Sequence, residues 1–213
     1  MTLVTEPYAA QVARWPRAGR HILAQFTADA VVVYQAYHPA IGHFAARHKF
    51  FGGAFSLNRM SWIKPNFLWM MYRSGWGTKE GQEVTLAIWL QRAAFDDILR
   101  QAVPSSFAPA VNSDEAAWKR AVARSSVRLQ WDPDHAPDGS ALERRAIQLG
   151  LRGDVLTQYA RAWIVDIEDI SDFVAEQRPR AQLGDHARLK TPREEVYPIS
   201  DPEIAARIGV LDN

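Results

Sequence analysis

The feature of this sequence that most constrains its folding is a run of aromatic residues interleaved with positive charges over residues 55–89. The run holds four tryptophans and four cations: Trp62, Trp69, Trp76, Trp89, Arg59, Lys64, Arg73 and Lys79. Aromatic residues alone would indicate a core, but a buried cation needs an anionic partner. A nucleotide offers both anionic oxygens and a flat ring. The run therefore favours a core segment that borders a nucleotide site.

The middle of this run predicts a helix over residues 66–73, because Pro65 suits the first turn of a helix. Residues 67–72 are apolar all round, which implies burial on every side. The loop that follows, residues 74–81, contains three glycines, two of which flank Trp76. Glycine lets the backbone approach a ligand closely, so this loop favours Trp76 as a ring that stacks on a ligand.

The rest of the chain predicts a single α+β domain with a mixed, mainly antiparallel sheet and flanking helices. Strands are predicted over residues 30–37, 83–90, 126–131 and 162–167, the third ending at residues 132–134. Helices are predicted over 40–50, 95–102, 115–124, 169–176 and 202–208. Residues 141–150 fit either a helix or a strand, and 103–115 read as a loop. No GxGxxG motif follows a strand, so a doubly wound sheet is not expected.

A shift in composition near residue 177 sets the expected domain boundary. We predict that residues 1–176 form the domain. Residues 177–213 are rich in arginine and proline, and we expect a tail packed on the surface or partly disordered.

Composition excludes several kinds of site. The absence of cysteine excludes disulfides, thiolate metal sites and a cysteine nucleophile. His43 and His48 are five residues apart rather than four, so no metal is expected there. A net charge of +1 gives the protein no strong overall electrostatic attraction to nucleic acid or to anionic membranes. No apolar run approaches about 18 residues, and the start of the chain does not read as a signal peptide. We expect a cytoplasmic protein with no membrane partner.

Several motifs together resemble the family of the domain of unknown function DUF4291. They are VYQAY at 33–37, RMSWIKPNFLWMMYRSGW at 59–76, KEGQE at 79–83, LQWDPDH at 129–135 and RAIQLGLRG at 145–153. The resemblance covers roughly residues 10–175 and implies no settled activity. Asp134 stands where the family motif has glutamate.

The layout of the chain is also similar to ADP-ribosyltransferases, particularly those that modify nucleic acids. An early strand ends in Gln35 and Tyr37, and an RxxQ-like pattern over residues 145–148 precedes a late strand. This resemblance implies NAD as the cofactor and a nucleotide or nucleic acid as the substrate. Gln148, or Glu143 by a shifted alignment, stands where those enzymes use glutamate.

These considerations assign roles to nine residues. Arginine and lysine side chains are expected to bind the phosphates: Arg59, Lys64, Arg73 and Arg145. Tyr37 and Trp76 are expected to stack on rings, and Gln148 or Glu143 to bind the ribose. Asp132 is the candidate general base. The alternative for Arg59 and Arg73 is a structural ion pair with an internal carboxylate, and Asp132 could instead cap its turn. Three functions stay open: an ADP-ribosyltransferase, a non-catalytic nucleic-acid-binding module, and a structural or partner-binding domain.

Overall fold

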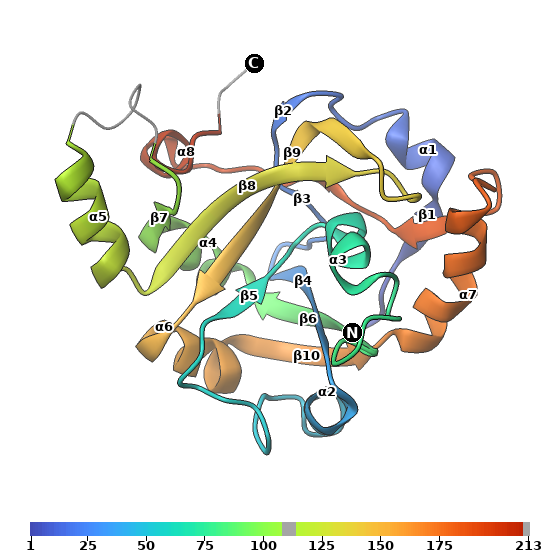
Figure 1. Ribbon diagram of the computed structural model, residues 1–213, viewed down its shortest axis with the longest axis horizontal. Coiled ribbons are helices and arrows are strands. Elements are labelled where there is room, and N and C mark those ends of the chain that lie inside the picture. Colours follow the sequence, from blue (N-terminus) through green and yellow to red (C-terminus); the bar gives the residue numbers. More distant parts are fainter. Residues whose placement is uncertain (108–113, 211–213) are drawn as a thin grey trace.

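Two sheets form the frame of the protein in the computed structural model, which describes residues 1–107 and 114–210 (Figure 1). The first sheet is antiparallel, in the order β10 (Ile164–Asp169), β6 (Val84–Gln91) and β4 (Ala30–Tyr37). The second has the order β2 (Gly19–Arg20), β9 (Ala141–Leu151), β8 (Val127–His135) and β7 (Ala102–Pro104), and β5 (Ser61–Ile63) also pairs with β9. The β2–β9 and β7–β8 pairs are parallel and the others antiparallel. The predicted α+β class with a mixed, mainly antiparallel sheet is confirmed.

One backbone bridge joins the two sheets. The Tyr34 N–H donates to the Lys64 carbonyl at 2.7 Å, and the Lys64 N–H donates to the Tyr34 carbonyl at 3.3 Å. Tyr34 belongs to β4, and Lys64 directly follows β5. The bridge therefore fixes Lys64 at the junction of the sheets.

Alternation along β4 divides its side chains between two cores. Val31 and Val33 pack into the core that also takes the apolar side chains of β8 and β9. Val32 and Tyr34 pack into the second core, which includes α3 (Phe67–Ser74) and α7 (Ser171–Gln182). Because both faces of β4 are covered, its sequence is apolar almost throughout.

Helix α3 forms where the sequence predicts it. The Asn66 side chain accepts a hydrogen bond from the Trp69 N–H at 2.7 Å, and Gly75 ends the helix with φ of 58°. The other helices are α1 (Tyr8–Val12), α2 (Pro39–His48), α4 (Arg92–Gln101), α5 (Glu115–Arg124), α6 (Gly153–Gln158) and α8 (Pro202–Ile208), and a π-helical turn, Tyr159–Trp163, follows α6. Figure 1 shows α3 in the centre of the molecule, between β8 and the β4–β6–β10 sheet.

The C-terminal segment differs from the expected surface tail. The expected boundary at residue 177 falls inside α7. Strand β11 (Lys190–Pro192) pairs with β1 (Thr5–Pro7), and β12 (Glu195–Val196) pairs with β3 (Leu23–Ala24). Leu189, Thr191, Glu194 and Tyr197 are buried. Backbone pairing with N-terminal strands, which composition does not reveal, makes residues 177–210 part of the same fold.

Two strands also run further than the sequence suggests. Residues 141–150, left open between helix and strand, belong to β9. Strand β8 continues through Pro133 to His135 with a register shift between these two residues, so the expected turn at 132–134 is a bulge within the strand. The predicted loop over residues 103–115 lies partly outside the described residues.

Candidate functional site

A cavity of about 530 Å³ opens beside the bridge that joins the two sheets. It is larger than two other hollows of about 190 and 230 Å³. The end of β4, strand β5 with the loop before it, helix α3 and the turn at residues 81–82 supply its walls. Residues that matter for its chemistry are Gln35, Tyr37, Phe55, Arg59, Ser61, Trp62, Lys64 and Arg73. Its volume suits a small-molecule site.

Three of the four predicted phosphate ligands line this cavity. Arg59, Lys64 and Arg73 come from the loop before β5, from the residue after β5, and from the last turn of α3. Within residues 1–107 and 114–210, no hydrogen bond or ion pair engages their charged ends. The expected alternative, a structural ion pair for each arginine, is therefore not seen among the described side chains. Three cations around one hollow create a positive potential that favours the entry of an anion.

Lys64 is the most constrained of the three cations. Only 6% of the residue is exposed, although its side chain borders the cavity. The pKa of Lys64 is lowered from 10.5 to about 8, mainly by burial and also by the nearby charge of Arg73, while Asp132 opposes the shift. An ammonium group held in this way gains from any anion that enters the cavity.

Hydroxyl and amide groups form one wall of the cavity. Gln35 Nε2 donates to Tyr37 Oη and to Ser61 Oγ, both at 2.8 Å, and Tyr37 Oη lies 2.7 Å from Ser61 Oγ. Behind them the buried Tyr159 hydroxyl donates to Gln35 Oε1 at 2.7 Å. Burial raises the pKa of the Tyr37 phenol well above its ordinary value, so this hydroxyl is a neutral hydrogen-bonding group at physiological pH.

Trp62, not Trp76, is the indole on the cavity wall. Trp76 is only 7% exposed, packs edge-on against Phe67, and donates from Nε1 to the Pro137 carbonyl at 3.2 Å. Its backbone has φ of 55°, which turns the side chain into the core. The expected ring-stacking role for Trp76 is therefore corrected. Trp62 lies two residues before Lys64 on an extended segment, so the two side chains share a face.

Asp132 and Gln148 are brought together beside the cavity, although neither lines it. Gln148 Nε2 donates to Asp132 Oδ2 at 2.7 Å and to Gln130 Oε1 at 2.8 Å. The pairing of Trp62 with Gly150, and of Gln130 with Gln148, puts this cluster on the sheet face that carries Lys64. Gln130 was not among the site residues predicted from the sequence. Its position two residues before Asp132 on a predicted strand, which places both side chains on one face, could have identified it.

Glu143 and Arg145 stand apart from these groups. Both side chains are exposed on β9, and Arg145 pairs with Arg20 of β2 and Pro133 of β8 in the sheet. Residue 145 is an odd number of positions from Gln148, so the two point to opposite faces. The structure does not bring Arg145 to the other cations, which corrects that expectation. Glu143, the alternative to Gln148 at the ribose, does not line the cavity.

A buried carboxylate from the C-terminal segment holds α3 in place. Glu194, 2% exposed, accepts hydrogen bonds from the Phe67 N–H at 2.6 Å and from Asn66 Nδ2 at 3.1 Å. Burial raises the pKa of Glu194 well above its ordinary value, and the hydrogen bond from the Phe67 N–H opposes the shift only in part. Because α3 carries Arg73 into the cavity, Glu194 positions one wall of the site from 128 residues away.

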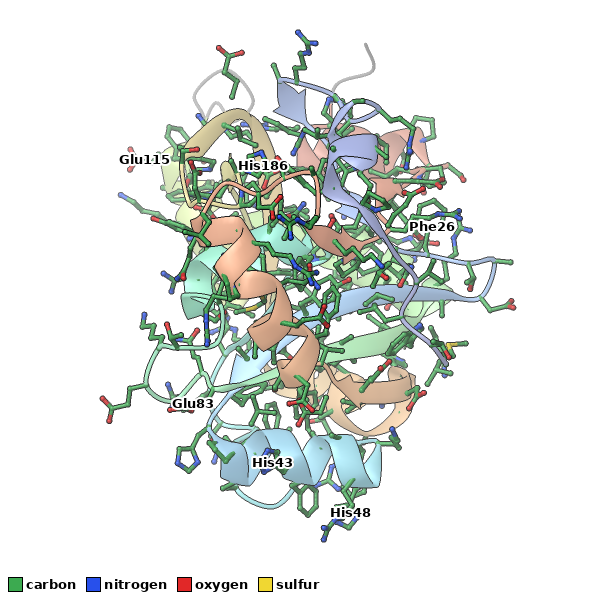
Figure 2. All side chains as sticks on the ribbon, turned by 90° about the vertical axis from the view of Figure 1, so that its right-hand side faces the viewer. Phe26, His43, His48, Glu83, Glu115 and His186 are labelled. Atoms are coloured by element: carbon green, nitrogen blue, oxygen red, sulfur yellow. The ribbon has the colours of Figure 1, made fainter. Side chains whose placement is uncertain are left out.

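Other features bear on the kind of site. His43 and His48 both lie on α2 at one edge of the molecule (Figure 2), and the described residues contain no cluster of three His, Asp or Glu side chains that could hold a metal ion. None of the helices in the described part of the chain has both the length and the apolar character needed to span a bilayer.

Comparison with known proteins gives a family for the chain. No curated protein matches it. The family model described as domain of unknown function (DUF4291) matches residues 21–197. The similarity to ADP-ribosyltransferases stays a prediction. The match spans most of the chain, and the protein therefore belongs to the DUF4291 family.

Proposed function

We propose that the cavity binds a nucleotide through its phosphates, and that the protein is an ADP-ribosyltransferase that uses NAD and acts on a nucleotide or nucleic acid. The observation that carries the proposal is the convergence of Arg59, Lys64 and Arg73 on one cavity, where none of the three forms an ion pair with a carboxylate of the described residues. Lys64 gives the strongest support, because a buried ammonium without an ion-pair partner is costly unless a ligand supplies one.

The residues around the cavity divide between the parts of such a ligand. Arg59, Lys64 and Arg73 suit the pyrophosphate, since guanidinium groups bind phosphate oxygens in pairs. Trp62 and Tyr37 offer ring faces and edges, and the Tyr37 and Ser61 hydroxyls can hydrogen-bond a ribose. When bound, NAD supplies an ADP-ribosyl group as its bond to nicotinamide breaks and the bonding electrons leave with nicotinamide.

Asp132 is the candidate general base for the acceptor substrate. Its carboxylate lies beside the cavity and close enough to Lys64 to affect the pKa of that lysine. Gln148 Nε2 donates to one carboxylate oxygen, Oδ2, at 2.7 Å. Oδ1 has no hydrogen-bond partner among the described residues and can accept a proton from the attacking group.

Thermal unfolding with NAD, AMP and a short RNA tests the proposal. A ligand at 100 times its Kd should stabilise the protein by about 2.7 kcal/mol, which corresponds to about 5 to 11 °C for a chain of this size. NAD should give the largest shift, Arg73→Ala should abolish it, and Arg145→Ala should keep it. The second variant is a matched control, because it removes an equal charge from an exposed site outside the cavity.

Three results would contradict the proposal. A shift with RNA alone would favour the non-catalytic nucleic-acid-binding module. The absence of any shift would favour a structural domain. If Arg73→Ala instead unfolds the protein without ligand, Arg73 has a structural role and the site assignment is wrong.

A further inference from the structure

The orientations of two amide groups beside the cavity are fixed by one carboxylate. A carboxylate only accepts hydrogen bonds, so the group of Gln148 that faces Asp132 at 2.7 Å is the NH₂. The same NH₂ faces Gln130 at 2.8 Å, so Gln130 must turn its carbonyl oxygen toward Gln148. Asp132 therefore determines which amide atoms of Gln130 and Gln148 remain for other partners.

The remaining atoms form a defined set of donors and acceptors, which we name the polar edge of Gln130, Asp132 and Gln148. Gln130 Nε2 is a donor, and Gln148 Oε1 and Asp132 Oδ1 are acceptors. None of these three atoms has a hydrogen-bond partner within the part of the chain that the structure describes. All three side chains are half-buried. Polar groups in such a position need partners from water or a ligand.

We propose that the polar edge recognises a guanine base, and that guanine nucleotides or guanine-containing nucleic acids are the acceptor substrates; the acceptor role rests on the proposed function. The Watson–Crick edge of guanine offers one acceptor, O6, and two donors, N1–H and the N2 amino group. The polar edge offers one donor and two acceptors, which is the complementary set. Adenine offers a single donor, the N6 amino group, beside its N1 acceptor, and cytosine offers one donor and two acceptors. Both leave groups of the polar edge unpaired.

The location of the polar edge suits a second substrate. Antiparallel pairing of Ile63 with Leu149 puts Lys64 next to Gln148 on the same face of the sheet. A base held by the polar edge therefore lies adjacent to the cavity that holds phosphates. None of the three polar-edge residues lines that cavity, so the atoms proposed to bind the base are separate from those proposed to bind the phosphates.

Calorimetric titration with GMP, IMP and AMP tests the inference, since the three share a phosphate and a ribose and differ only in the base. GMP should bind more tightly than AMP by about 5- to 150-fold, the range of a paired side-chain contact to a base edge. IMP, which lacks the N2 amino group, should fall between them. Asp132→Asn exchanges an acceptor for a donor and should bring the GMP to AMP ratio close to one.

Glu143→Gln is the matched control, because it removes one negative charge from an exposed site on the same sheet and should keep the preference. If Asp132→Asn fails to fold, Gln130→Glu tests the same edge by replacing the donor that faces O6. Equal affinities for the three nucleotides, no binding of any of them, or an Asp132→Asn protein that still prefers GMP would each overturn the inference.

A parallel titration with NAD separates this inference from the proposed function. If NAD binds and the mononucleotides bind without preference for guanine, guanine recognition by the polar edge is wrong and the proposed function stands. If NAD fails to bind while the GMP preference depends on Asp132, guanine recognition stands and NAD-dependent transfer is wrong.

Discussion

Replacing Lys64 with methionine should make the protein more stable and impair its binding site. Lys64 is 6% exposed, and its ammonium forms no ion pair or hydrogen bond among the described residues, although the more distant Asp132 acts on it. Methionine keeps the length and apolar stem of the side chain. It also leaves intact the backbone bridge to Tyr34 that joins the two sheets. The substitution therefore removes the cost of a buried charge and little else.

The pKa of Lys64 gives the size of this effect. A fall from 10.5 to about 8 means that the charged form is disfavoured in the folded protein by about 3 kcal/mol. Since the unfolded chain binds more protons than the folded protein between pH 8 and 10.5, wild-type stability gains from Lys64 as the pH rises through this window. Lys64→Met should therefore exceed the wild type by about 3 kcal/mol at pH 7 and by about 1.5 kcal/mol at pH 9.5.

Urea denaturation at the two pH values measures this difference, with Lys79→Met, an exposed lysine in the loop after α3, as the control. Thermal unfolding at pH 7 should show Lys64→Met melting about 6 to 12 °C higher than the wild type, while its affinity for AMP falls. A variant less stable than the wild type at pH 7, or a gap that does not narrow at pH 9.5, would refute the reasoning.

Three further predictions concern the groups around the cavity. Trp76→Ala should lower the free energy of unfolding by about 3 to 5 kcal/mol in chemical denaturation, whereas Trp62→Ala should reduce nucleotide affinity more than stability. If Trp76→Ala instead weakens nucleotide binding and Trp62→Ala mainly destabilises the protein, Trp76 is the ligand-facing ring. The raised pKa of Glu194 makes the protein less stable as the pH rises above the ordinary pKa of a glutamate. Glu194→Gln should therefore reduce this loss of stability in denaturation experiments from pH 5 to 8, and an unchanged pH dependence would contradict the pKa shift. Gln148→Glu places a second carboxylate where the Gln148 amide now lies, 2.7 Å from Asp132. Because two adjacent carboxylates do not both ionise easily, NMR titration should show one of the pair titrating near neutral pH. Two ordinary carboxylate pKa values would contradict the contact.

Local sequence signals predicted the main elements well. The β-branched run at residues 30–37 and the Pro65–Asn66 start of a helix correspond to β4 and α3. Short strands such as β1, β3 and β11 have no such signal, because each is held by backbone pairing with a distant segment. For the same reason, composition suggested a surface tail where the chain contributes Glu194 to the start of α3.

The candidate site was predictable where one short stretch supplies it. Arg59, Lys64 and Arg73 lie within a single run, and the structure brings all three to one cavity. Arg145 was expected to join them, but the strand register turns it to the other face of β9. Trp76 looked free because glycines flank it, yet those glycines let the backbone turn its ring into the core.

A crystal structure of the protein grown with AMP tests the central claim most directly. We predict that phosphate oxygens lie within hydrogen-bond distance of Lys64 Nζ and of the Arg73 guanidinium, inside the cavity beside the Tyr34–Lys64 bridge. A structure in which AMP binds elsewhere, or in which Lys64 and Arg73 pair with carboxylates of the protein, would contradict the account.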